Sequence, residues 1–93
     1  MPTELTIRNA IVRALKGVGC YVLVTTGVAD SGTPDLLVCW RGRFIALEVK
    51  REGMKATKLQ RQRIETIHGA GGTATTVHSV EEALGALGDK YEK

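Results

Sequence analysis

The chain has 93 residues, of which 43% are hydrophobic and 25% are charged, and its formal net charge is +3. This length leaves room for one modest core, so we expect a single domain over residues 1–93 with the composition of an ordinary soluble globular protein. No apolar run reaches the roughly 20 residues that span a bilayer, and the start Met1-Pro2-Thr3-Glu4 lacks the features of a signal peptide, so we expect a cytoplasmic protein without a membrane partner.

The pattern of apolar and turn-forming residues predicts seven elements. Apolar residues recurring every three to four positions indicate helices, and short runs rich in β-branched and aromatic residues indicate strands. The expected elements are a helix over 3–16, strands over 20–25, 35–40 and 43–50, a helix over 57–68, a strand over 73–77 and a helix that opens at Ser79. This αβββαβα order predicts a mixed α/β or α+β sheet domain. We expect the polar tail, residues 89–93, to fray.

Two capping boxes mark the starts of the later helices. Thr57-x-x-Gln60 and Ser79-x-x-Glu82 each place a hydroxyl three residues before a side chain that can bond back to the helix start. The middle helix is expected to turn an apolar stripe of Leu59, Ile64 and Ile67 inward.

The chain contains two cysteines, Cys20 and Cys39. Two thiols exclude a disulfide framework and a four-thiolate zinc site. Because both lie in apolar runs, we expect them to be reduced and buried.

The two strands joined at Arg41-Gly42 form the most informative segment. With a two-residue turn, the numbers of paired residues add up to 83, which places Asp35 opposite Glu48 on the same face of the sheet. Lys50, two residues beyond Glu48, shares that face. Arg-Gly is not a favoured hairpin turn, and a three-residue loop would break this pairing.

Two carboxylates placed opposite each other repel, so a positive group is expected between them. The candidates are Lys50 and a divalent cation held by Asp35, Glu48 and the Val49 carbonyl, hard oxygen ligands that suit Mg²⁺ or Mn²⁺. Alternatively, the charged side chains line a solvated sheet face. Because both faces of strand 43–50 carry apolar residues, a functional site is the favoured interpretation.

Two polar residues on inward helix faces are further candidates. Glu4 lies near the core-facing stripe of the first helix, although an acid at a helix start also complements the helix dipole and could pair with Arg8. Gln60 lies near the inward stripe of the middle helix, although its capping box with Thr57 explains it equally well.

Positive charge is concentrated in residues 48–63. Six basic residues against two acidic ones give this segment a charge of +4, more than the excess of the whole chain. A basic cluster beside a carboxylate site suits a polyanion such as DNA, and the alternative is a solvated helix face. The candidate DNA-binding residues are Arg51, Lys55, Lys58 and Arg61. Aromatic residues make up only 4% of the chain, which argues against base stacking as the main mode of recognition.

These motifs together resemble a known family. Gly32-x-Pro34-Asp35 followed by Glu48-Val49-Lys50 resembles the signature of PD-(D/E)XK nucleases, and Glu4 and Gln60 extend the match over nearly the whole chain. The subgroup that it resembles is the VRR-NUC domain, in the stand-alone form carried by bacterial viruses, which would place it in the host-cell cytoplasm.

The resemblance implies a restriction-endonuclease-like fold and a metal-dependent endodeoxyribonuclease. It implies metal ligands at Asp35, Glu48 and the Val49 carbonyl, and a lysine at position 50 that positions or activates water. Glu4 would be an accessory acid and Gln60 a supporting residue. Stand-alone members resemble homodimeric resolvases of four-way (Holliday) junctions in DNA recombination and repair. Flap or non-specific nucleases, an inactive DNA-binding module and a plain interaction domain are the alternatives.

Overall fold

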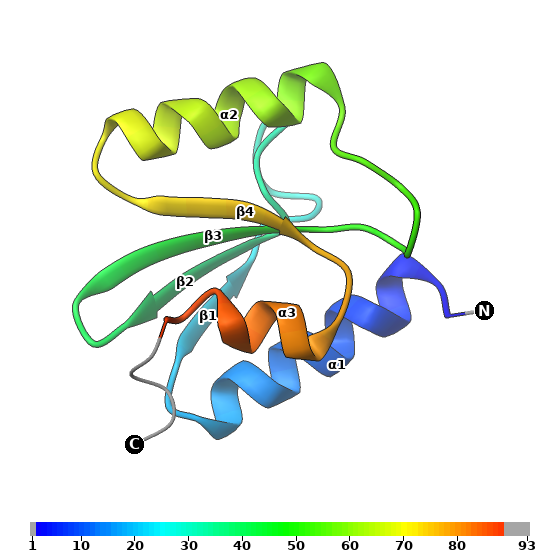
Figure 1. Cartoon of the computed structure of the whole chain (residues 1–93), viewed down its shortest axis with the longest axis vertical. Helices are drawn as coiled ribbons and strands as arrows, with labels where there is room; N and C mark the ends of the chain where they lie inside the picture. The colour runs from blue at the N-terminus through cyan, green and yellow to red at the C-terminus, as the bar shows by residue number, and fades with distance from the viewer. Residues whose placement is uncertain (1, 89–93) are drawn as a thin grey trace.

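The computed structural model describes residues 2–88, so the tail expected to fray, residues 89–93, lies outside the described residues. It contains three helices and four strands within these residues, in the expected order (Figure 1). Their bounds are α1 Glu4–Gly17, β1 Tyr21–Val24, β2 Leu36–Trp40, β3 Arg43–Val49, α2 Lys58–Gly69, β4 Thr73–Val77 and α3 Val80–Gly85. No helix among residues 2–88 is long and apolar enough to cross a membrane.

The strands form one mixed sheet in the order β1-β2-β3-β4. β1, β2 and β3 pair antiparallel, and β4 pairs parallel with β3 after the crossover through α2. In Figure 1, α2 lies on one side of the sheet, and α1 and α3 lie on the other. The expected mixed α+β architecture is therefore confirmed.

The β2–β3 hairpin has the expected register. Trp40 pairs with Arg43 and Leu36 pairs with Leu47. Arg41 has a φ of 53° and Gly42 a φ of 80°, the two positive values that a type I′ turn requires. Arg-Gly is not a favoured sequence for this turn, yet the two-residue turn is formed and the three-residue loop is not. Strand β2 begins at Leu36 rather than at the expected Asp35, which lies just before it.

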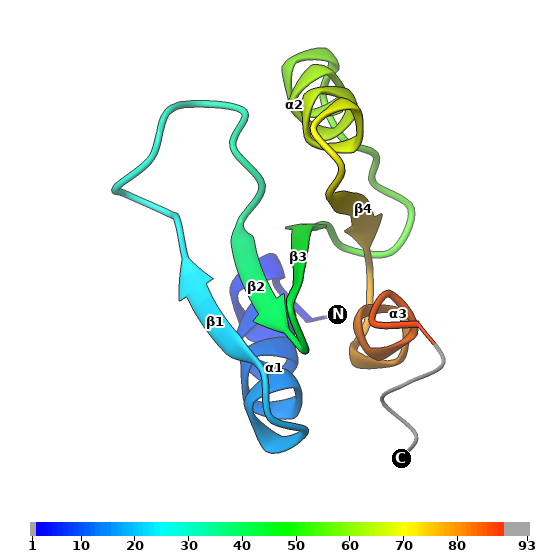
Figure 2. The same ribbon diagram turned by 90° about the vertical axis from the view of Figure 1, so that its left-hand side faces the viewer.

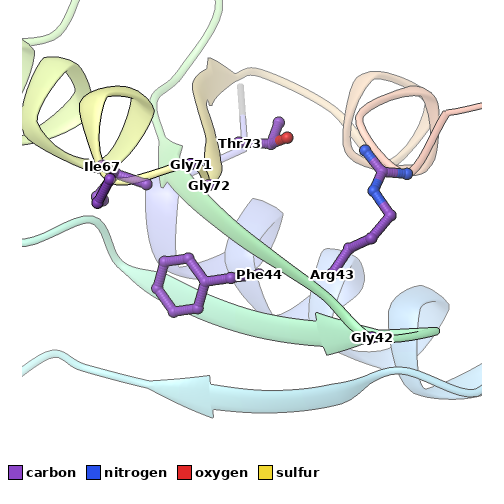
Figure 3. Close-up of a pocket in the computed structure, with 8 residues that line it drawn as sticks. Gly42, Arg43, Phe44, Ile67, Gly71, Gly72 and Thr73 are labelled. Carbon is purple, nitrogen blue, oxygen red and sulfur yellow. The ribbon is translucent and has the colours of Figure 1, made fainter.

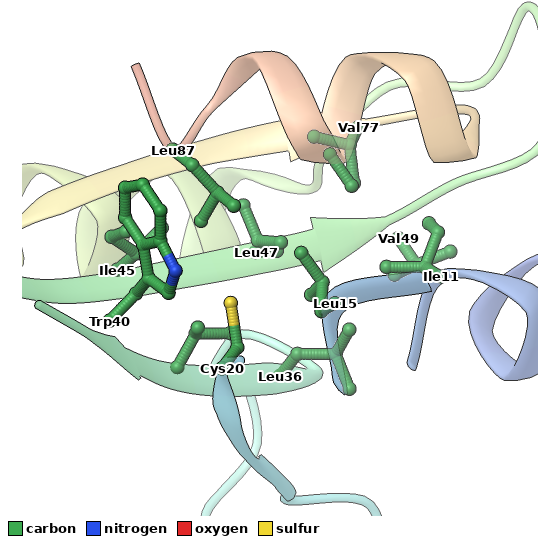
Figure 4. Close-up of a cluster of buried hydrophobic side chains, with 12 residues drawn as sticks. Ile11, Leu15, Cys20, Leu36, Trp40, Ile45, Leu47, Val49, Val77 and Leu87 are labelled. Atoms are coloured by element: carbon green, nitrogen blue, oxygen red, sulfur yellow. The ribbon is translucent and has the colours of Figure 1, made fainter. Parts of the chain in front are cut away.

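The core lies between the sheet and the helices α1 and α3 (Figure 4). Alternate residues of β2 and β3 point into it, because successive side chains of a strand face opposite sides. The Trp40 ring is buried, and its Nε1 donates to the carbonyl oxygen of Val18 at 3.3 Å. The largest fully buried side chains of this core are Ile11, Leu15, Leu36, Ile45, Leu47 and Leu87.

The opposite face of the sheet is only half covered. Helix α2 packs against β3 and β4 and leaves β1 and β2 open, as Figure 2 shows. Tyr21 is 69% exposed, and Leu23 and Phe44 are also exposed. Cys39 lies on this face and is exposed, so its expected burial was wrong, whereas Cys20 is buried and both thiols are free.

Helix α2 packs against the sheet with half-buried side chains. It has no buried residue: Leu59 is exposed, and Ile64 and Ile67 are half-buried. The expected inward stripe therefore exists only in part, because the helix covers one edge of the sheet.

The two expected capping boxes differ in the structure. At α2 the box is complete, with Thr57 Oγ1 accepting from the Gln60 amide at 3.2 Å and Gln60 Oε1 accepting from the Thr57 amide at 2.8 Å. At α3, Ser79 Oγ accepts from the Glu82 amide, but the Glu82 carboxylate accepts from the amide of His78 instead of that of Ser79. The second box is therefore only half formed.

Candidate active site

Asp35 is held at the point where the chain enters β2. The buried Thr25 hydroxyl donates to the carbonyl oxygen of Pro34 at 2.7 Å, and the Thr25 amide donates to the carbonyl oxygen of Asp35 at 2.9 Å. The Asp35 Oδ2 atom accepts from the amide of Val49 at 2.9 Å. The register of the hairpin, extended by one pair, places Asp35 opposite Glu48. Sequence reasoning missed Thr25, because a threonine at a strand end carries no distinctive signal.

Glu48 is a buried carboxylate near the end of β3, only 2% exposed. Its Oε2 atom accepts from Gln60 Nε2 at 3.0 Å and lies 3.9 Å from Lys50 Nζ. Its Oε1 atom is buried and has no hydrogen-bond partner. Burial first, and then the negative charge of Asp35, raise the pKa of Glu48 to about 8. Lys50 lowers this pKa, but by less than burial and Asp35 raise it.

Gln60 contacts both the start of its own helix and the buried acid. Its Oε1 atom completes the capping box of α2, and its Nε2 atom donates to the carboxylate of Glu48. An amide side chain can do both because it carries an acceptor and a donor. The first turn of α2 is thereby fastened to the end of β3.

Glu4 lies in the same region. Together with Asp35 and Val49 it lines a cavity of about 290 Å³ between the start of α1 and the ends of the strands. The negative charge of Glu4 contributes to the raised pKa of Glu48. The alternative pairing with Arg8 is not formed, because no ion pair within 4.0 Å joins these two described residues.

The donor set fits a divalent cation that keeps part of its water shell. Among residues 2–88, no three His, Cys, Asp or Glu side chains converge on one metal position. Asp35 and Glu48 would therefore supply two carboxylates. The Val49 amide donates to Asp35 at 2.9 Å, so the backbone of Val49 lies beside this carboxylate, and its carbonyl would be the third ligand that the motif implies. Two carboxylates and one carbonyl suit Mg²⁺, which usually retains several waters. The unpartnered Glu48 Oε1 is an available ligand atom.

The four basic candidates occupy different positions. Arg51 is exposed and lines a cavity with Glu4 at the start of α1. Lys58 is exposed at the start of α2, and Lys55 lines a separate cavity of about 410 Å³. Arg61 lines this same cavity, and its Nη1 donates to the carbonyl oxygen of Ala56 at 2.8 Å. Of these four residues, Arg51 is therefore the one that shares a cavity with a candidate acid, Glu4.

A larger cavity of about 460 Å³ lies at the opposite end of β3, next to the hairpin turn (Figure 3). Gly42, Arg43 and Phe44 form one side of it, and Ile67 with the turn after α2 forms the other. None of its lining residues is a carboxylate. The acidic site therefore does not lie in the larger of these two cavities.

The fold defines the class of protein first. A mixed sheet flanked by helices, with Asp35, Glu48 and Lys50 at one end of neighbouring strands, is a restriction-endonuclease-like domain. No family model matches the sequence, and no curated protein matches it.

Two solved structures then narrow the class. One, titled "VRR_NUC domain", has a TM-score of 0.79 and 25% identity, and the match covers 97% of this chain and 100% of that chain. Another, titled "VRR_NUC domain protein", has a TM-score of 0.73, and the match covers 92% of this chain and 85% of that chain. At 18% identity, the second bears on the fold alone. The chain therefore has a VRR-NUC domain, a domain of a nuclease family, as its motifs indicate.

Proposed function

We propose that the protein is a metal-dependent endodeoxyribonuclease that hydrolyses phosphodiester bonds. The observation that carries this proposal is the convergence of Asp35, Glu48 and Lys50 at one end of the sheet, with Glu48 Oε1 buried and unpartnered. A buried carboxyl with a pKa near 8 is costly to ionise, so this arrangement lowers the stability of the protein when Glu48 is charged. A cation that binds both acids offsets this cost.

Each residue has a proposed role in this reaction. Asp35, Glu48 and the Val49 carbonyl hold Mg²⁺ or Mn²⁺, which when bound lowers the pKa of a water and offsets charge on phosphate. Lys50 orients the attacking water and stabilises negative charge that develops on the phosphate. Gln60 positions Glu48 through its bond to Oε2. In-line attack then releases a 3′-hydroxyl and a 5′-phosphate.

The acid at the start of α1 and the basic residues complete the proposal. Glu4, on the wall of the cavity that Asp35 lines, acts as an accessory acid that holds water. The exposed cations Arg51, Lys55, Lys58 and Arg61 contact the DNA backbone, which supplies affinity without reading sequence.

The proposed substrate is a four-way DNA junction, cut by a homodimer. Resolving a junction needs two symmetric cuts, and two copies related by a two-fold axis supply two sites. A second copy can cover the open half of the sheet, because the exposed Tyr21 and Leu23 lie there on β1, whose outer edge is unpaired within residues 2–88. Leu23→Glu is expected to leave a monomer, measured by light scattering with and without a junction.

Cleavage of synthetic DNA tests the activity and its target. Wild-type protein with Mg²⁺ or Mn²⁺ is expected to cut a four-way junction faster than a flap or a linear duplex. Chelator and Asp35→Ala each abolish cutting, and Lys50→Ala abolishes cutting while it spares DNA binding. Equal rates on all three DNAs would indicate a non-specific nuclease. DNA binding without cutting would indicate an inactive binding module, and neither binding nor cutting would indicate an interaction domain.

A further inference from the structure

Arg8 lies on the wall of the acidic cavity. It follows Glu4 by four residues in α1, so both side chains lie on one face of the helix. Both line the cavity of about 290 Å³ that Asp35 and Val49 also line. The Arg8 side chain is half-buried. A cation therefore stands among the carboxylates of the proposed active site.

The guanidinium of Arg8 is only weakly engaged. Its Nη1 donates to Thr26 Oγ1 at 3.3 Å and its Nη2 to Asn9 Oδ1 at 3.5 Å, both long for hydrogen bonds. Its Nε is buried with no hydrogen-bond partner. Within residues 2–88 no carboxylate forms an ion pair with it. A half-buried arginine normally satisfies its five donors or pairs with an acid.

We propose that Arg8 binds a backbone phosphate of DNA at this cavity, a step that rests on the proposed nuclease function. A planar guanidinium binds phosphate oxygens through two parallel hydrogen bonds. Glu4 and Asp35 line the same cavity, and Arg8 offsets part of the repulsion between these acids and a phosphate that enters it. Thr26, at the start of the loop after β1, accepts the long hydrogen bond from Arg8 Nη1 and also lines this cavity.

The alternative is that Arg8 only balances the neighbouring acids. In that case its removal changes the stability of the protein and leaves the contacts with DNA unchanged. The dependence of DNA affinity on salt separates these two roles, because each phosphate contact contributes about 0.9 to the slope of log K against log salt.

The test compares wild type with Arg8→Gln, Arg8→Lys and the control Arg13→Gln, which removes an exposed arginine further along α1. Binding of a fluorescent four-way junction is measured by anisotropy in EDTA between 50 and 200 mM salt. Arg8→Gln is expected to reduce the slope by about 0.9. Arg8→Lys keeps the wild-type slope, because lysine retains the charge. Arg13→Gln is expected to match wild type.

Single-turnover cleavage with Mn²⁺ is the second measurement. Arg8→Gln is expected to slow cleavage about 100-fold, as loss of one donor to a developing charge does, and Arg8→Lys to restore part of the rate. An Arg8→Gln slope equal to that of Arg13→Gln would overturn the assignment of Arg8. If Arg8→Gln fails to fold, Arg8→Lys decides. A wild-type cleavage rate and a wild-type DNA affinity at every salt concentration would refute a bidentate contact. A reduced cleavage rate would support it. Wild-type protein that cuts no DNA would refute the nuclease, while the binding slope would still decide the role of Arg8.

Discussion

Replacing Glu48 by Gln is expected to stabilise the metal-free protein at high pH. Glu48 is 2% exposed, and its pKa rises from 4.5 to about 8. Gln has nearly the same shape, and its amide oxygen can still accept the bond that Gln60 donates at 3.0 Å. The substitution therefore removes the buried charge while it retains the packing.

The pH dependence follows from the direction of this shift. Below about pH 4.5 the Glu48 carboxyl is protonated in both the folded and the unfolded chain. Between pH 4.5 and about 8 the folded chain keeps a proton that the unfolded chain releases, so the free energy of unfolding falls as the pH rises. At about 1.4 kcal/mol per pH unit, the full loss is at most about 5 kcal/mol. This is comparable to the whole stability of many small domains, about 5–15 kcal/mol.

Urea unfolding in EDTA at several pH values between 5 and 9 measures this effect. The difference in unfolding free energy between Glu48→Gln and wild type is expected to grow in favour of the variant up to about pH 8 and then level off. Contact with the Met54 carbonyl and then with Glu82 raises the pKa of His78, which also lowers stability as the pH rises. That contribution is common to both proteins and cancels in the difference. A difference that does not change between pH 5 and 9 would refute the reasoning. Mn²⁺ is expected to stabilise wild type and to leave Glu48→Gln unchanged.

Three further substitutions test how the surroundings position the acids. Gly32→Ala is expected to lower the unfolding free energy by about 1–3 kcal/mol, because Gly32 has a φ of +87° and an added methyl group would meet the Leu59 Cγ atom at 2.5 Å. Urea unfolding measures this, and an unchanged midpoint would contradict it. Thr25→Val removes a buried hydroxyl that donates to a loop carbonyl, at a cost of about 1–3 kcal/mol, and weaker Mn²⁺ binding in calorimetry is expected with it. Gln60→Ala loses both the cap of α2 and the bond to the buried Glu48, so circular dichroism should show a melting temperature about 4–8 °C lower. An equal decrease in the melting temperature of Thr57→Ala would trace the effect to the cap alone.

The hairpin could be predicted from the sequence because its register depends on local features. A two-residue turn at Arg41-Gly42 and the alternation of apolar residues suffice to pair Trp40 with Arg43. The capping box of α2 is equally local, since Thr57 and Gln60 are three residues apart. The metal and water roles of the acids remain proposals.

Features that depend on distant segments could not be predicted in this way. The expected burial of Cys39 was wrong because helix α2 packs only against β3 and β4, and how much of a sheet a helix covers depends on tertiary packing. The bond from the Thr25 hydroxyl to the Pro34 carbonyl and the bond from Arg8 to Thr26 depend on how the loop after β1 folds back over the start of β2. Glycine and proline mark that loop in the sequence, but they do not specify which side chain it turns inward.

The turn at the far end of the hairpin governs the geometry of the acidic site. A shift of one residue in strand pairing moves every side chain to the other face of the sheet. Asp35 would then face away from Glu48, and its bond to the Val49 amide would be lost. The positive φ values of Arg41 and Gly42 therefore do more than close a loop, since they set the register that brings the carboxylates together. The turn ends at Gly42, six positions before Glu48, and through the register of the short strand β3 it fixes which side chains face each other at the proposed metal site.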